Sequence, residues 1–553
     1  MTALLDAPGR IAPPRASAAH HLTGTGTLIR LALRRDRVLL PVWVTVLVLM
    51  MASVNRSLED VYTTAAERAD LARDMNGNGS LRALYGAVFA DSYGGLTVWR
   101  IGAYSALLAG IMSVIIVIRH TREEEETGRQ EALSAAMVGR RAPLTAALAT
   151  AGLANALVLA LYPAVLIGAG RPATGSLVFG AAVALSGMAF AGIAAVAAQL
   201  TENARLAKGI AIAVLGVAFV LRAAGDAAED AAAHGSHLLV WLSPLGWAES
   251  VRPFAGDRWW VLGLPAGFAA VCVAAAYTLA GRRDLGAGFI RPRPGPAEAP
   301  ASLGGAYGLA WRLQRGTLLA WTVGFAFAGA VFGGIADGAD DIVGENARTR
   351  DIFERMGGHQ GLTDAFLSTL VGMLGLVCVL FATGAVLRLR AEETEERAEP
   401  LLANAVGRLR WAGGHLVIAY LGSAVVLAAG GLTMGLSYGI AADDVGGQVP
   451  RLVLAALAQA PAVWVLTGVA VLIFGALPRL TVAVWGLVGL VIALGWLGPA
   501  LELPQAALDV SPFGHLPKLP GADVTAAPYA WLLAIALALP TIGLASLRRR
   551  DMG

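Results

Sequence analysis

Charged residues are scarce in this sequence of 553 residues: Asp, Glu, Lys and Arg make up only 15%, and lysine occurs just twice, at Lys208 and Lys518. A water-soluble protein has about 25% charged residues and, at this length, divides into several water-facing domains. Apolar residues instead reach 56%, occur in long blocks and give a mean hydropathy of +0.64. These properties exclude a water-soluble protein and indicate a membrane-embedded one.

Cysteine is also rare. Cys272 and Cys378 both lie inside apolar blocks, which excludes a framework of structural disulfides or a zinc site. His234 and His237 lie three residues apart in a predicted outer loop, where solvated surface histidines are more common than metal ligands. The chain has no P-loop sequence and no convincing catalytic motif. We therefore expect no catalytic residue, no metal site and no cofactor bound by this chain itself.

The apolar blocks predict the membrane-spanning segments, because crossing the hydrocarbon core takes about 20 mostly apolar residues in a helix. The expected spans lie at about 38–54, 96–118, 142–168, 174–199, 206–224, 260–280, 316–336, 365–387, 411–440, 452–477, 480–500 and 526–546. The sequence thus predicts an all-α polytopic membrane protein with about twelve transmembrane helices.

The distribution of basic residues predicts the orientation. With both termini cytoplasmic and twelve alternating spans, the cytoplasmic segments contain most of the 42 Arg and Lys residues, as the positive-inside rule requires. Residues 1–25, which precede the first basic cluster, are polar and rich in Pro and Ala, and we expect a disordered N-terminal tail.

An internal repeat divides the chain into two similar halves. A shift of 268 residues aligns 122–140 with 390–408, and the same shift aligns 243–246 with 511–514. Because each half contains six spans, both halves insert with the same orientation and form a parallel repeat. The predicted organisation is a first six-span repeat at 26–284, a Pro/Gly/Ala-rich cytoplasmic linker at 285–305 and a second six-span repeat at 306–553.

Two duplicated motifs mark the repeats. The first is a charged segment between the second and third span of each half, at 119–141 and 392–410, where acidic residues followed by Arg favour a short helix. The second is Ser-Pro-x-Gly before the last span of each half, where Ser caps an outer helix and Pro occupies its first position. The residues of this second motif are Ser243, Pro244 and Gly246 in the first half and Ser511, Pro512 and Gly514 in the second.

The duplicated charged segments, the six spans per half and the outer element before the sixth span resemble type-2 ABC exporter permeases. The fused twelve-span form is similar to actinobacterial permeases described as exporters of polyketide antibiotics, including the tetronasin-resistance group. The resemblance implies a subunit of the bacterial plasma membrane that exports a hydrophobic or amphiphilic small molecule. It also implies two copies of a separately encoded ABC ATPase, which bind ATP and Mg on the cytoplasmic side and do not involve nucleic acid.

In such permeases the charged segments are coupling helices, which contact the ATPase subunits. The residues that match the first coupling segment are Glu124, Glu125, Arg129, Glu131, Gly139 and Arg140. Those that match the second are Glu392, Glu393, Arg397, Glu399, Gly407 and Arg408. Family members often carry Pro shortly before the Gly-Arg end, whereas this chain has Met137 and Ala405 near that place. The resemblance does not identify the residues that bind the cargo.

Two other classes of function compete with the exporter. A secondary carrier driven by an ion gradient usually buries ionisable residues near the middle of its spans, and no predicted span carries one there. A lipid-modifying membrane enzyme needs clustered His, Asp or Glu, whereas Asp337, Asp340, Asp341 and Glu345 read as a solvated loop. The exporter is therefore favoured over both alternatives.

Overall fold

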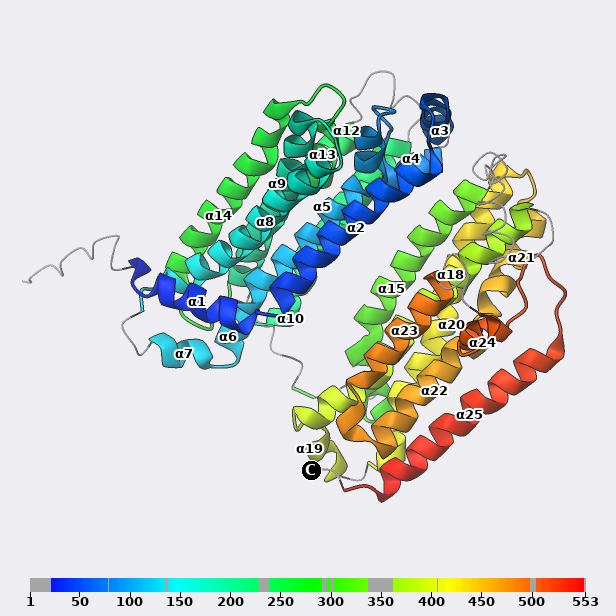
Figure 1. Cartoon of the computed structure of the whole chain (residues 1–553). Coiled ribbons are helices and arrows are strands. Elements are labelled where there is room, and N and C mark those ends of the chain that lie inside the picture. The colour runs from blue at the N-terminus through cyan, green and yellow to red at the C-terminus, as the bar shows by residue number, and fades with distance from the viewer. Residues whose placement is uncertain are drawn as a thin grey trace, which may run out of the picture. The chain divides into compact units, whose positions relative to one another are not determined.

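The computed structural model describes residues 21–551 except 78, 135–137, 228–237, 291–294, 296, 299, 301–302, 337–361, 405 and 498–503. His234, His237, Met137, Ala405 and the acidic loop at 337–345 lie outside the described residues. The chain forms two compact units, Met1–Pro294 and Gly295–Gly553 (Figure 1). Each unit is described by itself below.

The first unit is built of helices, most of them long and apolar. Their bounds are α1 (Thr25–Arg35), α2 (Leu39–Val61), α3 (Ala65–Gly77), α4 (Gly79–Tyr85), α5 (Tyr93–Arg119), α6 (Arg122–Glu126), α7 (Arg129–Ser134), α8 (Ala142–Gly168), α9 (Ala173–Leu200), α10 (Ala204–Ala227), α12 (Leu238–Trp241), α13 (Pro244–Ser250), the 3₁₀ helix η2 (Trp259–Leu262) and α14 (Gly263–Arg282).

The second unit is also helical. Its elements are α15 (Ala306–Ala336), α18 (Leu362–Thr394), α19 (Ala398–Leu402), α20 (Arg408–Ala441), α21 (Val445–Leu457), α22 (Ala460–Ala476), η4 (Pro478–Leu480), α23 (Ala483–Leu497), α24 (Gln505–Leu508), η5 (Pro512–His515) and α25 (Ala526–Arg549). The described residues of both units contain no β-strand, which confirms the predicted all-α class.

Eleven helical segments in the described part of the chain are long and apolar enough to span a membrane, and each overlaps one of the predicted spans. The remaining prediction, at 480–500, corresponds to α23. This helix has 15 residues and a length of about 22 Å at 1.5 Å per residue, which is shorter than the roughly 30 Å hydrocarbon core. The polytopic membrane fold is therefore confirmed, and the count of twelve remains a prediction.

Small residues bring the helices of the first unit close together. Helix α9, rich in Ala and Gly, is its most buried span and packs against α5, α8, α10 and α14. The amide of Asn155 on α8 lies against Gly187 of α9 and donates a 2.9 Å hydrogen bond to the Ser113 hydroxyl on α5. Because a Cβ at position 187 would collide with Asn155, glycine is required there.

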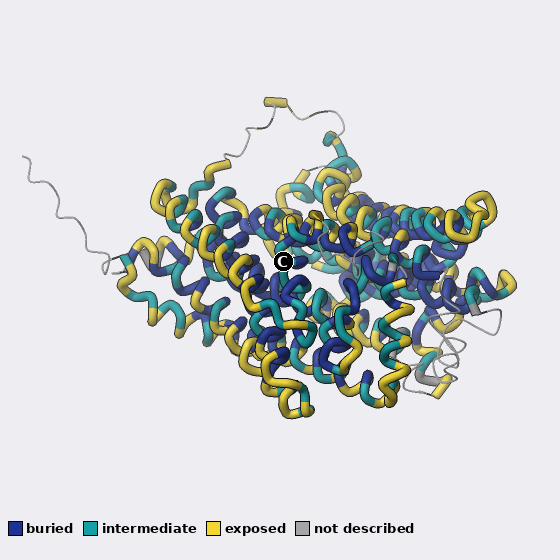
Figure 2. Tube along the Cα trace, turned by 90° about the horizontal axis from the view of Figure 1, so that it is seen from above, coloured by how far each residue is buried: buried dark blue, intermediate teal, exposed yellow. Residues whose placement is uncertain are grey.

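Glycine has the same role in the second unit. Gly329 and Gly333 of α15 lie directly against the backbone carbonyls of Gly430 and Met434 on α20, where no Cβ fits. This close approach lets the two longest apolar helices pack along their length. Figure 2 shows buried stretches gathered inside each unit and exposed stretches at its periphery. Exposed apolar side chains such as Val271 and Leu537 form a surface suited to lipid.

Candidate functional site

The two charged segments reverse direction at the same position of the repeat. In the first unit α6 ends at Glu126, Gly128 adopts a left-handed φ of +71°, and α7 follows. In the second unit α18 continues to Thr394, Glu396 adopts a left-handed φ of +58°, and α19 follows. Gly128 and Glu396 are 268 residues apart, so the sequence repeat is also a repeat of backbone conformation. The single short helix expected in each segment is instead a turn that separates two helical pieces.

An equivalent ion pair closes this turn in both units. The Arg129 Nε lies 3.1 Å from the Glu124 carboxylate, and the Arg397 Nε lies 3.1 Å from the Glu392 carboxylate. The hydrogen bonds to Glu392 raise the pKa of Arg397 above the ordinary arginine value. Glu124 also pairs with Arg35 of α1, which extends the first network to the helix before the first span.

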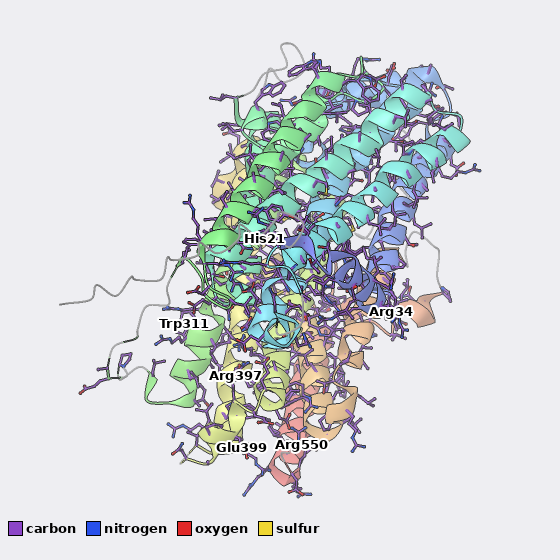
Figure 3. The ribbon with its side chains drawn as sticks, turned by 90° about the vertical axis from the view of Figure 1, so that its left-hand side faces the viewer. His21, Arg34, Trp311, Arg397, Glu399 and Arg550 are labelled. Carbon is purple, nitrogen blue, oxygen red and sulfur yellow. The ribbon has the colours of Figure 1, made fainter. Side chains whose placement is uncertain are left out.

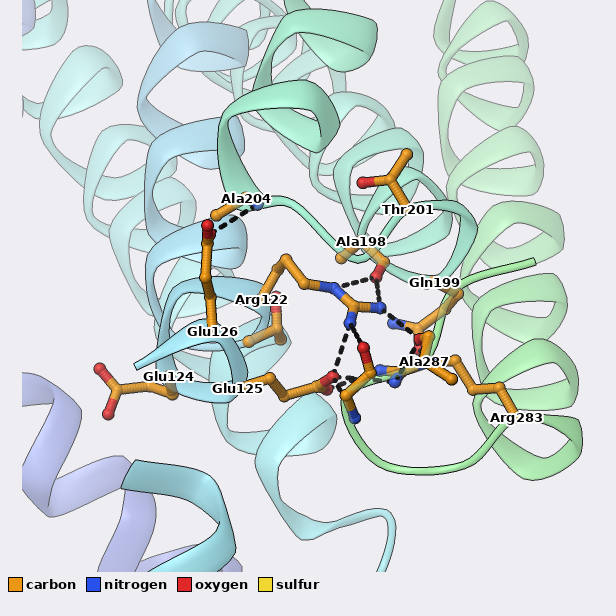
Figure 4. A network of polar contacts seen from close by, with 12 residues as sticks. Arg122, Glu124, Glu125, Glu126, Ala198, Gln199, Thr201, Ala204, Arg283 and Ala287 are labelled. Atoms are coloured by element: carbon orange, nitrogen blue, oxygen red, sulfur yellow. Dashed lines mark hydrogen bonds and ion pairs between the residues drawn. The ribbon is translucent and has the colours of Figure 1, made fainter. Parts of the chain in front are cut away.

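A second equivalent set of contacts joins each charged segment to the residue that caps the last helix of its unit. In the first unit Glu125 accepts hydrogen bonds of 2.5 and 2.8 Å from the Arg283 guanidinium, and Arg140 donates one of 2.7 Å to the Arg283 carbonyl (Figure 4). We call Glu125, Arg140 and Arg283 the first clamp. Its residues lie on both sides of α7 and at the end of α14.

The second clamp consists of Glu393, Arg408 and Arg550. The Arg550 guanidinium donates a 2.6 Å hydrogen bond to Glu393, and Arg408 donates one of 2.5 Å to the Arg550 carbonyl. Arg397, Glu399 and Arg550 all lie at the same end of the second unit (Figure 3). Five of the predicted coupling residues, Arg408 among them, therefore take part in matching contacts in their own unit.

Burial distinguishes the two segments. Arg122 is fully buried, and its guanidinium contacts Glu125 at 2.8 Å and the carbonyls of Ala198, Gly286 and Ala287 (Figure 4). Its repeat counterpart Arg390 has 37% of its side chain exposed and pairs with Glu393 at 3.1 Å. The first segment is thus integrated into its unit more deeply than the second.

The first segment is also attached to the start of α10. Glu126 accepts hydrogen bonds from the Asn203 amide at 3.0 Å and the Ala204 N–H at 2.9 Å, and Lys208 donates one of 2.9 Å to Glu123. A carboxylate at a helix start is favoured because it satisfies free N–H groups and opposes the helix dipole. The repeat counterparts of Glu123 and Glu126 are Ala391 and Thr394, which carry no charge.

Two predicted coupling residues face solvent. Glu131 on α7 and Glu399 on α19 are exposed, and neither side chain makes a hydrogen bond or ion pair with any residue that the structure describes. The predicted glycines end the segments: the buried Gly139 donates its N–H to the Thr23 carbonyl at 2.9 Å, and Gly407 is the N-cap of α20. The two glutamates are therefore available to a partner, whereas the glycines have backbone roles.

The Ser-Pro-x-Gly motifs differ between the units. The Ser243 hydroxyl accepts from the N–H groups of Leu245 and Gly246 and caps α13, with Pro244 in its first turn. Ser511 makes no such cap, and its hydroxyl has no partner. The predicted cap at Ser511 is wrong because Pro512 begins a four-residue 3₁₀ helix, in which Gly514 bonds the Ser511 carbonyl.

This difference predicts unequal effects of removing the two hydroxyls. The Ser243 hydroxyl is buried and also donates a 2.6 Å hydrogen bond to the Ala218 carbonyl on α10. We expect Ser243→Ala to destabilise the protein by about 1–2 kcal/mol. Ser511→Ala, the matched control, should have almost no effect. Thermal unfolding of both purified variants tests this, and equal losses would contradict it.

The sequence analysis missed several ionisable residues that the fold buries. Asp36 is fully buried beside Arg119 and His120 at the end of α5, and Arg222 pairs with Asp226 at 2.9 Å near the end of α10. The clamp arginines Arg283 and Arg550 were interpreted only as topology signals. Within the described ranges, no group of three or more His, Cys, Asp or Glu side chains has the arrangement of a metal site.

The sequence is similar to known efflux proteins. The profile for the C-terminal domain of the multidrug efflux system permease Rv1217c matches residues 303–548. Over its full length, the chain is similar to the multidrug efflux system permease protein Rv1217c of Mycobacterium tuberculosis (strain ATCC 25618 / H37Rv). The two are 46% identical over 545 residues, which cover 98% of this chain and 97% of the relative.

Proposed function

The chain belongs to the family of the multidrug efflux system permease protein Rv1217c, and from this premise we propose that it is the permease subunit of an ATP-driven ABC exporter. It is a multi-pass protein of the bacterial membrane. The proposed cargo is a hydrophobic or amphiphilic small molecule, taken from the cytoplasm or the inner leaflet and released outside. Polyketide antibiotics of the tetronasin type are one such class.

The observation that carries the proposal is the duplicated arrangement of the charged segments. Each segment presents an exposed glutamate, Glu131 or Glu399, on a short helix held between residues of a clamp. A solvated loop has no need to retain both the charges and the contacts twice. Two similar segments are what a partner present in two copies requires, which supports a pair of identical ATPase subunits.

In this proposal the chemistry of ATP is confined to the partner. Two copies of a separately encoded ABC ATPase bind ATP and Mg and dock on the charged segments, which act as coupling helices of a type-2 exporter. The chain described here contributes the transmembrane pathway and the docking surfaces. It is a transport subunit and carries out no bond-breaking step of its own.

A transport assay in inside-out vesicles tests the energy source. We expect vesicles containing the chain and its ATPase to accumulate ethidium, a hydrophobic cation, only with ATP, and vanadate should block the accumulation. An uncoupler of the proton gradient should leave it unchanged. Accumulation without the ATPase, lost when the uncoupler is added, would instead establish the ion-gradient-driven secondary carrier.

A further inference from the structure

We propose that Arg283 and Arg550 are positioning residues that transmit movement of each charged segment to the last span of the same unit. This inference rests on the proposed function, because the movement originates in the docked ATPase. It concerns residues outside the duplicated motif: the sequence repeat aligns at a shift of 268, whereas Arg283 and Arg550 are 267 apart. A comparison at constant shift therefore fails to pair them, although their contacts correspond.

The geometry of one residue supports the transmission. The Arg283 side chain binds Glu125, which precedes α7, and its carbonyl binds Arg140, which follows α7. Arg283 is itself the C-cap of α14. A single residue at the end of the last span thus holds both ends of the helix that carries Glu131. A displacement of α7 must either move the end of α14 or break these charge-assisted bonds.

The second unit repeats this arrangement. The Arg550 side chain binds Glu393 before α19, and its carbonyl binds Arg408 after α19. Arg550 is the C-cap of α25, and its guanidinium also donates a 2.7 Å hydrogen bond to the Phe474 carbonyl of α22. The same connection formed from non-aligned residues indicates that the contact itself, rather than one ancestral side chain, has a function.

Low exposure makes these contacts stronger than surface ion pairs. The Glu125 and Arg283 side chains are 5% and 9% exposed, and those of Glu393 and Arg550 are 10% and 12% exposed. Charges removed from water interact strongly and are screened little by salt. The first clamp also includes buried Arg122, so we expect it to transmit more than the second.

The adjacent arginines provide matched controls. Arg282 and Arg549 immediately precede the two clamp residues, are exposed, and carry the same charge. If the arginines act only through the positive-inside rule, Gln at either position has the same consequence. If the clamps transmit movement, only Arg283→Gln and Arg550→Gln impair transport.

The experiment compares R283Q/R550Q with R282Q/R549Q, each co-expressed with the ATPase. Ethidium transported per ATP hydrolysed is the readout, because a purely structural role does not change this ratio. We expect R283Q/R550Q to reduce the ratio about tenfold while the ATPase still co-purifies. R282Q/R549Q should match the unmodified protein, and R283Q alone should have a larger effect than R550Q alone.

Stability is controlled by membrane abundance and by a chain truncated after Arg549, which removes the Arg550 side chain and carbonyl without altering a span. The truncated chain should lose coupling at least as strongly as R550Q. Equal ratios for the Arg283/Arg550 and Arg282/Arg549 variants overturn this inference and leave the proposed function intact. Failure of the unmodified chain to bind any ATPase overturns both.

Discussion

The double substitution of Glu131→Arg with Glu399→Arg is expected to abolish ATP-driven export while the protein still folds and inserts. Both side chains are exposed and have no partner among the described residues, so their replacement removes no internal contact. Because both segments present an acidic residue at the same place, a docking partner presents positive charge there. A reversed charge on each segment should weaken ATPase binding at least about 100-fold.

The measurement is co-purification of the ATPase together with ethidium transport. Glu298→Arg is the control, because Glu298 is an exposed carboxylate in the segment between the two units, remote in sequence from the charged segments. It should bind ATPase and transport normally. Survival of both ATPase binding and transport in the double variant would show that the charged segments are not the docking surfaces.

Arg122→Ala is expected to be the most destabilising single change in the charged segments. Arg122 is fully buried and donates to Glu125 and to three backbone carbonyls, all of which would lose a charged donor. Removing one partner from a buried ionic network costs about 3–5 kcal/mol. The first unit should therefore fold poorly, with a large fall in the amount of monodisperse protein recovered from membranes.

Arg390→Ala is the matched control because Arg390 occupies the equivalent position of the repeat. Its side chain is 37% exposed, and an ion pair of that kind contributes at most about 1 kcal/mol. We expect recovery and thermal stability close to those of the unmodified protein. Equal losses in the two variants would contradict the difference in burial between the segments.

Periodicity and charge predicted most of the fold because lipid permits few solutions. Long apolar blocks must become helices, and the described spans overlap the predictions at 38–54 through 452–477 and at 526–546. Helix α23 differs because its apolar run is interrupted: Pro478 begins a 3₁₀ turn, and the helix starts only at Ala483. Apolar composition alone does not reveal where such a turn shortens a helix.

The site could be predicted only in part. Repeat identity located Glu124, Arg129 and their counterparts, and these residues form the same ion pair in both units. It did not locate Arg283 and Arg550, because contacts between sequence positions more than 150 residues apart depend on packing. The cap at Ser511 failed for a related reason: identical residues can begin an α-helix in one context and a 3₁₀ helix in another.

Co-purification of the intact chain with its ATPase tests the central claim most directly. The chain is co-expressed with the candidate subunit and pulled down, its stoichiometry is determined by native mass spectrometry, and vanadate-sensitive ATP hydrolysis is assayed with and without ethidium. We predict a stable complex of one chain with two ATPase copies and hydrolysis stimulated by the cargo. A chain that transports ethidium yet binds no ATPase would contradict the account and identify an ion-gradient-driven carrier.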